Sequence, residues 1–374
     1  MAGMGNVLGL VFASMHDLTI TDLTKLRTMS SVPFGARYRL IDFTLSNMVN
    51  SGINEIGVVT KSNYQSLLDH LGSGAEWDLN RKNGGLQILP PYGHAGGGLY
   101  RGRLDALSGV YDYISESTAD YVLMSDCDVV VNLDLRAALE YHKEKKADIT
   151  IIYGKGNYTA AEMLTKTVLE VKDDGQVYDV LVRPDKAGEF NTSMNLFFLK
   201  RDFLLELIKE TTARNLYSFE VDVIQHKLND FRIFGYKYSG YYEQIDSVTG
   251  YFKANMALMD KAKRTELFND DRLIYTKIRD EAPAKYGIEA NASNSLVADG
   301  CVIEGNVENC VLFRGVKIGK GAVVKNSILM QDTIVGDKCE LNYVIADKDV
   351  RVGAYRSMYG APDYPVFISK GAEV

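Results

Sequence analysis

Cysteine is scarce in this chain of 374 residues, and its few cysteines lie far apart. No two of them form the C-x-x-C spacing of paired zinc ligands, which argues against a structural zinc site. Scattered single thiols are typical of reduced, buried cysteines in a cytoplasmic protein. The four are Cys127, Cys301, Cys310 and Cys339.

Basic residues are also too few to give the chain a positive field. Lysines and arginines number 42 against 49 aspartates and glutamates, so the formal net charge is −7. This balance argues against nucleic acid or an anionic membrane as a partner. No apolar run reaches the length of a membrane span, and no basic flank precedes the first one as in a signal peptide. We expect a soluble, cytoplasmic protein.

Glycine is missing from the first turn of the chain. The apolar run over 7–12 predicts a buried parallel strand. Such a strand often leads into a glycine-rich turn that binds phosphate through backbone N–H groups. Here the turn, Ala13 to Leu18, contains no glycine.

Hydrophobic periodicity predicts two domains and a connector. Over 1–263, strand-like runs alternate with helix-like segments, which indicates an α/β domain with a mostly parallel sheet. Ligands of such sheets bind beyond the carboxyl ends of the strands. A loop rich in proline and glycine is expected over 90–98. The polar segment 264–287 is the expected connector, and 288–374 the expected second domain.

The second domain has a different pattern, with apolar residues recurring every six positions and glycines between them. This period is typical of a hexapeptide parallel β-helix, whose coils bury their apolar faces on one another. The expected inward positions are Leu296, Val302, Leu312, Ile318, Val324, Ile328, Ile334, Val344 and Val350.

Beyond the turn, the chain reads V-P-F-G over 32–35, Y-R-L-I-D-F over 38–43 and L-S-N over 45–47. With these segments it resembles the sugar-nucleotide pyrophosphorylases, specifically the glucose-1-phosphate adenylyltransferases that make ADP-glucose. The resemblance covers nearly the whole chain. It implies a Rossmann-like nucleotidyltransferase domain followed by a left-handed parallel β-helix. It also implies a reaction in which glucose 1-phosphate attacks the α-phosphorus of ATP and pyrophosphate leaves.

The phosphate loop departs from that family. Residues 12–24 align without a gap with the family's phosphate loop, which reads L-A-G-G-x-G-T-R-L-x-x-L-T and is followed by K-P. Its glycines, arginine and lysine fall on Ser14, Met15, Asp17, Thr19 and Met29. Side chains there crowd the backbone approach to phosphate, and an aspartate repels it. The resemblance is therefore to the GlgD-type subunits of the family, unless another loop supplies the lost cations.

The metal site is expected to be half complete. Asp126 closes an apolar strand and matches the aspartate of the family's G-D-H motif, which binds Mg²⁺. The family's second aspartate, in Y-W-R-D-V-G, aligns with Gln244, and a neutral amide is a poor ligand for a hard cation. Glu243 or Asp246 is a possible substitute after a small shift. The alternative is that Asp126 only caps its strand.

The sugar-phosphate side is expected to be better preserved. Arg183 stands at the lysine of the family's E-K-P, and a guanidinium suits phosphate. Val182 replaces the glutamate that holds a sugar hydroxyl. Ser193 keeps the serine of S-M-G, and Asn195 replaces its glycine. Arg183 as an ordinary surface ion-pair residue is an equal alternative.

On the nucleotide side, Tyr100 and Gly102 keep the family's Y-R-G, and Asp105 follows. The next two family residues, T-A, have become Arg103 and Leu104, whose bulk is expected to narrow the base pocket. His16 has no serine or cysteine partner in the pattern, which argues against a nucleophilic triad.

These features predict a regulatory, non-catalytic subunit that pairs with a catalytic homologue in a heterotetramer and acts in glycogen biosynthesis. Such a chain requires no cofactor of its own, whereas the complex requires Mg²⁺. Glucose 1-phosphate or another sugar phosphate is a possible ligand. The alternatives are a nucleotidyltransferase that works weakly alone, and a sensor that binds a sugar phosphate without turnover.

Overall fold

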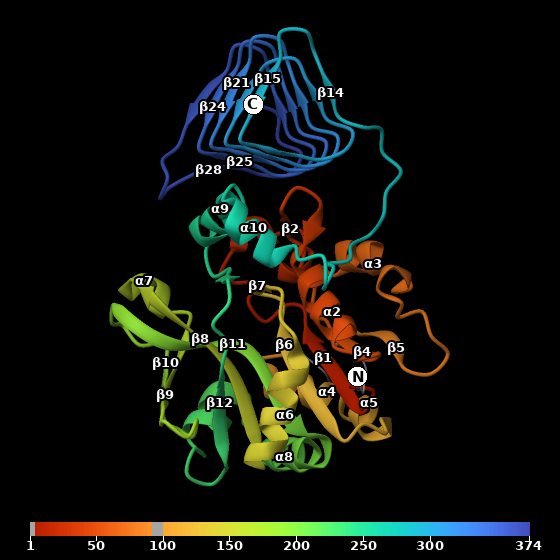
Figure 1. Cartoon of the computed structure of the whole chain (residues 1–374), viewed down its shortest axis with the longest axis vertical. Helices are drawn as coiled ribbons and strands as arrows, with labels where there is room; N and C mark the ends of the chain where they lie inside the picture. Colours follow the sequence, from red (N-terminus) through yellow and green to blue (C-terminus); the bar gives the residue numbers. More distant parts are fainter. Residues whose placement is uncertain (1–3, 92–99) are drawn as a thin grey trace.

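The computed structural model describes residues 4–91 and 100–374, so the loop expected over 90–98 lies almost entirely outside the described residues. An α/β domain forms the lower part of the molecule and a three-sided β-helix the upper part (Figure 1). The expected fold class is thereby confirmed. Within the described ranges, no helix has both the length and the apolar character needed to cross a bilayer.

A nine-stranded mixed sheet organises the first domain. Its central strands β6, β1, β4 and β5 run parallel, whereas β11 runs antiparallel to β6 and β8. The main path is β10 (Val177–Val182), β9 (Thr167–Val171), β11 (Gly188–Lys200), β6 (Tyr121–Asp126), β1 (Val7–Phe12), β4 (Glu55–Val59) and β5 (Gly85–Leu89). Off this path, β8 (Ile149–Tyr158) pairs with β11, and β12 (Ile233–Lys237) pairs with β8.

Helices cover both faces of this sheet, which explains why β1 is apolar throughout. Leu8, Leu10 and Phe12 of β1 pack on one face, and Val7 and Val11 on the other. The first face carries α4 (Arg103–Gly109), α5 (Tyr111–Glu116) and α8 (Arg201–Ala213). The second carries α2 (Leu40–Asn50), α3 (Gln65–Leu71) and α6 (Leu135–Lys145).

Shorter elements complete the domain. They are α1 (Thr21–Thr24), α7 (Ala160–Met163), α9 (Val248–Ala257), α10 (Lys261–Leu267), two 3₁₀ turns (Met29–Ser31, Ala75–Trp77), a π-helix (Phe219–Gln225), the pair β2 (Pro33–Phe34) and β3 (Tyr38–Arg39), and the pair β7 (Val129–Val131) and β13 (Tyr242–Gln244). Helix α10 continues past residue 263, at which we expected the first domain to end.

The β-helix consists of three five-stranded parallel sheets. The first contains β14 (Lys285–Tyr286), β17 (Val302–Ile303), β20 (Lys317–Ile318), β23 (Ile334–Val335) and β26 (Arg351–Val352). The second contains β15 (Asn291–Ser293), β18 (Asn306–Glu308), β21 (Val323–Lys325), β24 (Glu340–Asn342) and β27 (Ser357–Tyr359). The third contains β16 (Leu296–Val297), β19 (Val311–Leu312), β22 (Ile328–Leu329), β25 (Val344–Ala346) and β28 (Val366–Ile368). Strand β14 begins inside the expected connector.

The six-residue period places most, but not all, of the inward positions. Leu312, Ile318 and Val324 are buried inside the coils as expected. At Val302 and Ile334 the expectation is wrong by one residue, because their neighbours Ile303 and Val335 are the ones that point inward. It is also wrong at Leu296 and Ile328, which face the first domain instead of the interior of the coils. Successive residues of a strand face opposite sides, so only one of each apolar pair reaches the interior.

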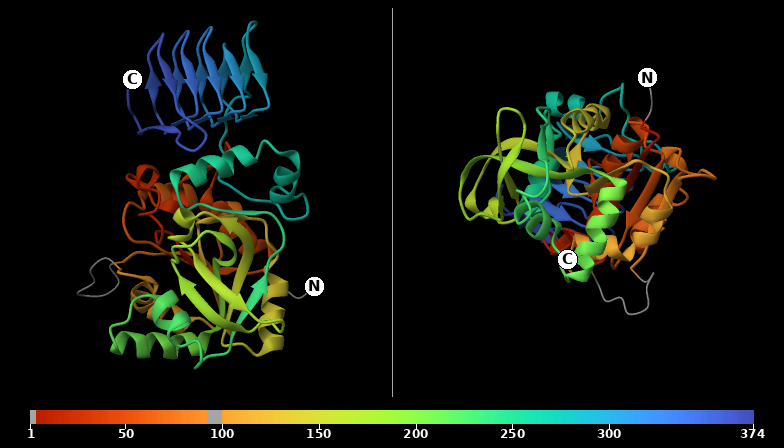
Figure 2. Two further views of the ribbon diagram at one scale, coloured as in Figure 1. Left: turned by 90° about the vertical axis from the view of Figure 1, so that its left-hand side faces the viewer. Right: turned by 90° about the horizontal axis from the view of Figure 1, so that it is seen from below.

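One sheet of the β-helix joins the two domains. Val311, Ile328 and Ile345 point away from the coils into a core shared with Phe34 and Tyr251 of the first domain. Alternate residues of the same strands point into the coils, so this sheet is apolar on both faces. Figure 2 shows the coils side by side, with one edge of each coil against the first domain.

Candidate functional site

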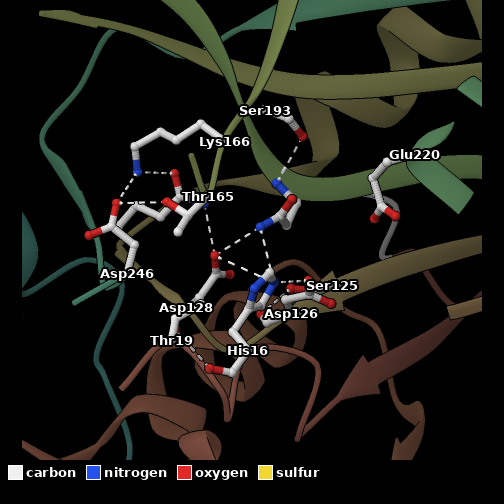
Figure 3. A network of polar contacts seen from close by, with 12 residues as sticks. His16, Thr19, Ser125, Asp126, Asp128, Thr165, Lys166, Ser193, Glu220 and Asp246 are labelled. Carbon is white, nitrogen blue, oxygen red and sulfur yellow. Dashed lines mark hydrogen bonds and ion pairs between the residues drawn. The ribbon is translucent and has the colours of Figure 1, made fainter. Parts of the chain in front are cut away.

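The register of the central strands brings the first turn of the chain to Asp126. Phe12 at the end of β1 lies opposite Asp126 at the end of β6. The turn that follows β1 therefore starts beside that carboxylate, at the carboxyl edge of the sheet, where ligands of α/β domains bind. Figure 3 shows His16 of this turn together with Asp126 and Asp128.

The turn is closed by its own side chains. The Asp17 Oδ1 atom accepts a hydrogen bond of 2.7 Å from the backbone N–H of Met29. The Thr19 hydroxyl donates to the His16 carbonyl at 2.8 Å. Burial raises the pKa of Asp17 to about 7, although the Met29 amide opposes this shift. Ser14 is buried, and Met15 packs against the core. All five departures from the phosphate loop therefore lie in or against one compact turn.

Asp126 is fully engaged by cationic and polar side chains of this chain. The Arg103 guanidinium donates from Nη1 to Oδ1 at 2.6 Å and from Nη2 to Oδ2 at 2.8 Å. The His16 Nε2 atom lies 2.7 Å from the same Oδ2. Burial alone would raise the pKa of Asp126, but Arg103 and His16 outweigh it and hold this pKa at about 2. The two neighbours thus keep the buried carboxylate ionised.

Asp128, two residues on, is held by amides. The side chains of Asn195 and Gln244 each donate to its Oδ2 at 2.8 Å. Its Oδ1 is buried without a hydrogen-bond partner among the described residues. One ligand atom each from His16, Asp126 and Asp128 lies within 4.8 Å of the others, which makes this the one candidate metal cluster in the described ranges.

Gln244 is tied to a second ion pair. Its carbonyl oxygen accepts from the Lys166 ammonium at 3.0 Å, and the same ammonium lies 2.6 Å from the Asp246 carboxylate (Figure 3). Lys166 is buried, with 3% of its side chain exposed. Asp246 is therefore committed to Lys166, and it does not take the place of the missing aspartate at Gln244.

The sugar-phosphate candidates lie on both sides of this network. Ser193 is buried, and its hydroxyl accepts from the backbone N–H of Asn195 at 3.1 Å. Arg183 is exposed, and its backbone is left-handed with φ 54°. No partner of its guanidinium lies in the described part of the chain, so its role toward phosphate stays a prediction. A cavity of about 210 Å³ nearby is lined by Lys155, Gly156, Tyr158, Glu162, Lys166, Tyr242, Gln244, Asp246 and Gly250.

Two of the nucleotide-side candidates lie against other residues of this chain. Asp105 forms an ion pair of 2.7 Å with Arg101. Gly102 sits so close to the Tyr217 carbonyl that a Cβ would come within 2.3 Å of it. Tyr100 is mostly buried, and its hydroxyl has no partner among the described residues. We expected the bulk of Arg103 to narrow the base pocket. In the structure the Arg103 guanidinium points to Asp126 and forms an ion pair with it.

Sequence reasoning missed three participants. His16 was considered only as a nucleophile partner, Arg103 only for its bulk, and Lys166 not at all. Their contacts with Asp126 and Asp246 join residues that lie 23 to 110 positions apart. The available signal was the replacement of small family residues by Arg103 and Asn195.

A second pocket lies between the domains and is lined by cations without a carboxylate among them. Its basic residues come from the β2–β3 hairpin, α3, the connector and the β-helix. Burial, with further repulsion from Arg39 and Arg27, lowers the pKa of Lys348 to about 7. The lining residues are Pro33, Ala36, Arg37, Tyr38, Arg39, His70, Lys277, Arg279, Phe313, Arg314, Gln331 and Lys348. Such a wall attracts anions.

Comparison with known proteins identifies the families of both domains. The nucleotidyl transferase family model matches residues 19–261, and the GlmU-like C-terminal hexapeptide model matches residues 282–358. The chain is 36% identical to the glycogen biosynthesis protein GlgD of Bacillus subtilis over 98% of this chain and 96% of that protein. It is 33% identical to a glucose-1-phosphate adenylyltransferase of Clostridium botulinum over 94% of this chain and 98% of the relative.

A similar enzyme of Geobacillus stearothermophilus is 35% identical over 85% of this chain and 83% of its own length. The family model spans more than half of the chain, and the three relatives are matched over 83% to 98% of their own length. The chain therefore belongs to the nucleotidyl transferase family and, within it, to the GlgD-type proteins of glycogen biosynthesis.

Proposed function

We propose that this chain is a regulatory, non-catalytic subunit of glucose-1-phosphate adenylyltransferase. The observation that carries the proposal is the closed first turn. Where the family resemblance places the triphosphate, the Asp17 carboxylate already occupies the backbone N–H of Met29. In its ionised form the Asp17 carboxylate repels phosphate, and at any pH a turn without glycine keeps the phosphate at a distance from the backbone.

The charges that are missing around the first turn and at Gln244 support the same conclusion. The resemblance expects an arginine and a lysine at Thr19 and Met29, where they would neutralise the departing pyrophosphate. Electrostatic stabilisers of this kind are worth about 10²–10³ in rate each. Gln244 adds a neutral amide in place of an anionic metal ligand.

A catalytic homologue must therefore supply the chemistry. We propose that it joins this chain in a cytoplasmic heterotetramer, without a role for nucleic acid or a membrane. The chain itself requires no cofactor, and the Mg²⁺ of the complex belongs to the catalytic partner. Regulation then follows from population shift, since a subunit that prefers one conformation of its partner changes that partner's activity.

The cationic pocket between the domains supports a role in responding to an effector. Its wall contains Arg37, Arg39, Arg314 and Lys348, and no aspartate or glutamate is among its described lining residues. Because it contacts both domains, an anion bound there would alter how they sit on each other. We propose a small polyanion as the ligand.

Two other functions stay open as alternatives. The first is a weak nucleotidyltransferase that works alone, for which the intact Asp126 is the main support. The second is a sensor in which Arg183 and the nearby cavity bind glucose 1-phosphate without turnover. A calorimetric titration with glucose 1-phosphate tests the sensor alternative, because binding of the sugar phosphate would be detected as heat released or absorbed.

The proposal is tested by measuring ADP-glucose formation in three samples. They are the purified chain alone, the chain with its catalytic homologue, and the chain with a homologue whose metal site is disabled. We expect turnover only in the second sample, with kinetics that differ from those of the homologue alone. Turnover in the third sample would show that this chain performs the chemistry.

A gain-of-function variant tests the closed turn directly. It restores glycine at three positions, arginine at one and lysine at one. We expect the isolated variant to move toward ATP binding if the turn is the deficit. The five substitutions are Ser14→Gly, Met15→Gly, Asp17→Gly, Thr19→Arg and Met29→Lys.

A further inference from the structure

We propose that the Arg103 guanidinium is the cation that neutralises Asp126 in the site at the carboxyl edge of the sheet. The guanidinium takes the place at Asp126 that the family resemblance gives to a divalent metal ion, so this chain does not bind a catalytic metal there. The sequence expectation of a half-complete metal site at Asp126 is replaced by a complete ion-pair site. The claim concerns the same pocket as the proposed function and goes further, because it assigns what neutralises the carboxylate.

Both carboxylate oxygens of Asp126 already have hydrogen-bond partners within this chain. Arg103 donates to both carboxylate oxygens in the forked geometry that a guanidinium and a carboxylate share. His16 takes a further position on Oδ2. Both side chains of the ion pair are buried, with 3% of Arg103 and none of Asp126 exposed. Solvent therefore does not screen this pair, and removing Arg103 leaves the buried Asp126 carboxylate with His16 as its one remaining ion-pair partner among the described residues.

Side chains from several elements surround the Arg103 guanidinium. Its centre lies 4.8 Å from the ring centre of Phe12 and 5.2 Å from that of Phe197. Glu220 of the π-helix accepts from Nη2 at 2.9 Å and from Nε at 3.2 Å. Two aromatic rings and a second carboxylate hold the cation favourably. Arg103 is thus held by contacts with three other elements, β1, β11 and the π-helix.

The backbone fixes the same arrangement. Arg103 is the first residue of α4, and the preceding Gly102 lies against the Tyr217 carbonyl. Leu104 donates its backbone N–H to that carbonyl at 3.1 Å. The start of the helix is therefore anchored to the segment before the π-helix, which supplies Glu220. The anchoring keeps the Arg103 side chain aimed at Asp126.

With Arg103 in place, the groups around Asp126 do not suit a hard divalent cation. Mg²⁺ needs an octahedral set of oxygen ligands. In the described cluster, Asp128 offers one unpartnered oxygen, Oδ1, while its Oδ2 already accepts from Asn195 and Gln244. A metal ion at Asp126 would also lie against a guanidinium that is always charged. The residues present therefore do not fit the metal that the family implies.

The test uses Mn²⁺ as the probe and the full chain as the protein. Free Mn²⁺ is followed by its electron paramagnetic resonance signal during titration. We expect the wild-type chain to bind no stoichiometric Mn²⁺, and Arg103→Thr to bind one ion at least tenfold more tightly than the wild type. Adding Asp126→Asn to Arg103→Thr should abolish that gain. The matched control is Arg101→Thr, two residues away on an exposed ion pair, which should behave like the wild type.

Several outcomes would overturn the proposal. One is stoichiometric Mn²⁺ binding by the wild type that Asp126→Asn abolishes, and this result decides the matter even if Arg103→Thr does not fold. Another is a folded Arg103→Thr variant, verified by circular dichroism, that gains no Mn²⁺. Stoichiometric Zn²⁺ binding by the wild type that His16→Ala removes would assign the cluster to a metal instead. Since the readout is metal binding, the proposed function and this inference can fail separately.

Discussion

A buried ion pair across the domain boundary offers the sharpest stability prediction. Arg27 donates from Nη2 to both carboxylate oxygens of Asp347 at 2.8 Å. Only 3% and 4% of the two side chains are exposed. In Arg27→Met, Asp347 keeps the backbone N–H of Lys348 as a donor at 2.7 Å but loses its counter-charge. Breaking one side of such a pair costs about 3–5 kcal/mol, because the other charge stays buried.

The assay is urea unfolding followed by the fluorescence of Trp77, the single tryptophan, which is buried in the first domain. The double variant Arg27→Met/Asp347→Leu should be far less destabilised than Arg27→Met, since it leaves no unpaired charge. The control is Lys325→Met, because the Lys325–Glu308 pair is about half exposed on both sides and should cost at most about 1 kcal/mol. A loss below about 1 kcal/mol for Arg27→Met would refute the reasoning.

Three further predictions concern other buried groups. Burial lowers the pKa of His142 to about 4, so between pH 6.5 and 4 the unfolded chain binds the extra proton at this residue, and the His142 contribution to stability falls as the pH drops. From pH 7 to pH 5 we expect this contribution to fall by about 2 kcal/mol, measured in urea titrations as the change in the stability difference between the wild type and His142→Gln. Sulfate affinity, measured by calorimetry at constant ionic strength, should fall several-fold as the pH rises through about 7, where Lys348 loses its charge, and Lys348→Met should abolish this dependence. Lys166→Met should cost about 3–5 kcal/mol in thermal unfolding by leaving Asp246 without its cation, and Lys166→Met/Asp246→Leu should recover most of it.

The fold was predictable because it depends on repeated patterns. The apolar run of β1 and the alternation of strands and helices follow from burial on both faces of the sheet. The six-residue period gave the β-helix, and its failures at Val302 and Ile334 have a simple cause. Both belong to pairs of adjacent apolar residues, and a period cannot say which member of a pair faces inward.

The site was predictable only in outline. Alignment to the family identified Asp126 and the departures at Asp17 and Gln244, but not what those departures contact. Arg103 reaches Asp126 through the placement of α4 beside the end of β6, which no local pattern encodes. His16 reaches it through the register of β1 and β6. Contacts between such distant residues depend on the assembled sheet, and a single sequence does not show them.

The central claim is that side chains of the first turn occupy the place where the family binds the triphosphate. Calorimetric titration of the isolated chain with ATP and Mg²⁺ tests that claim most directly, with the catalytic homologue titrated in parallel. The account predicts saturable binding by the homologue and none by this chain at millimolar nucleotide. Saturable, Mg²⁺-dependent ATP binding by this chain alone would contradict it.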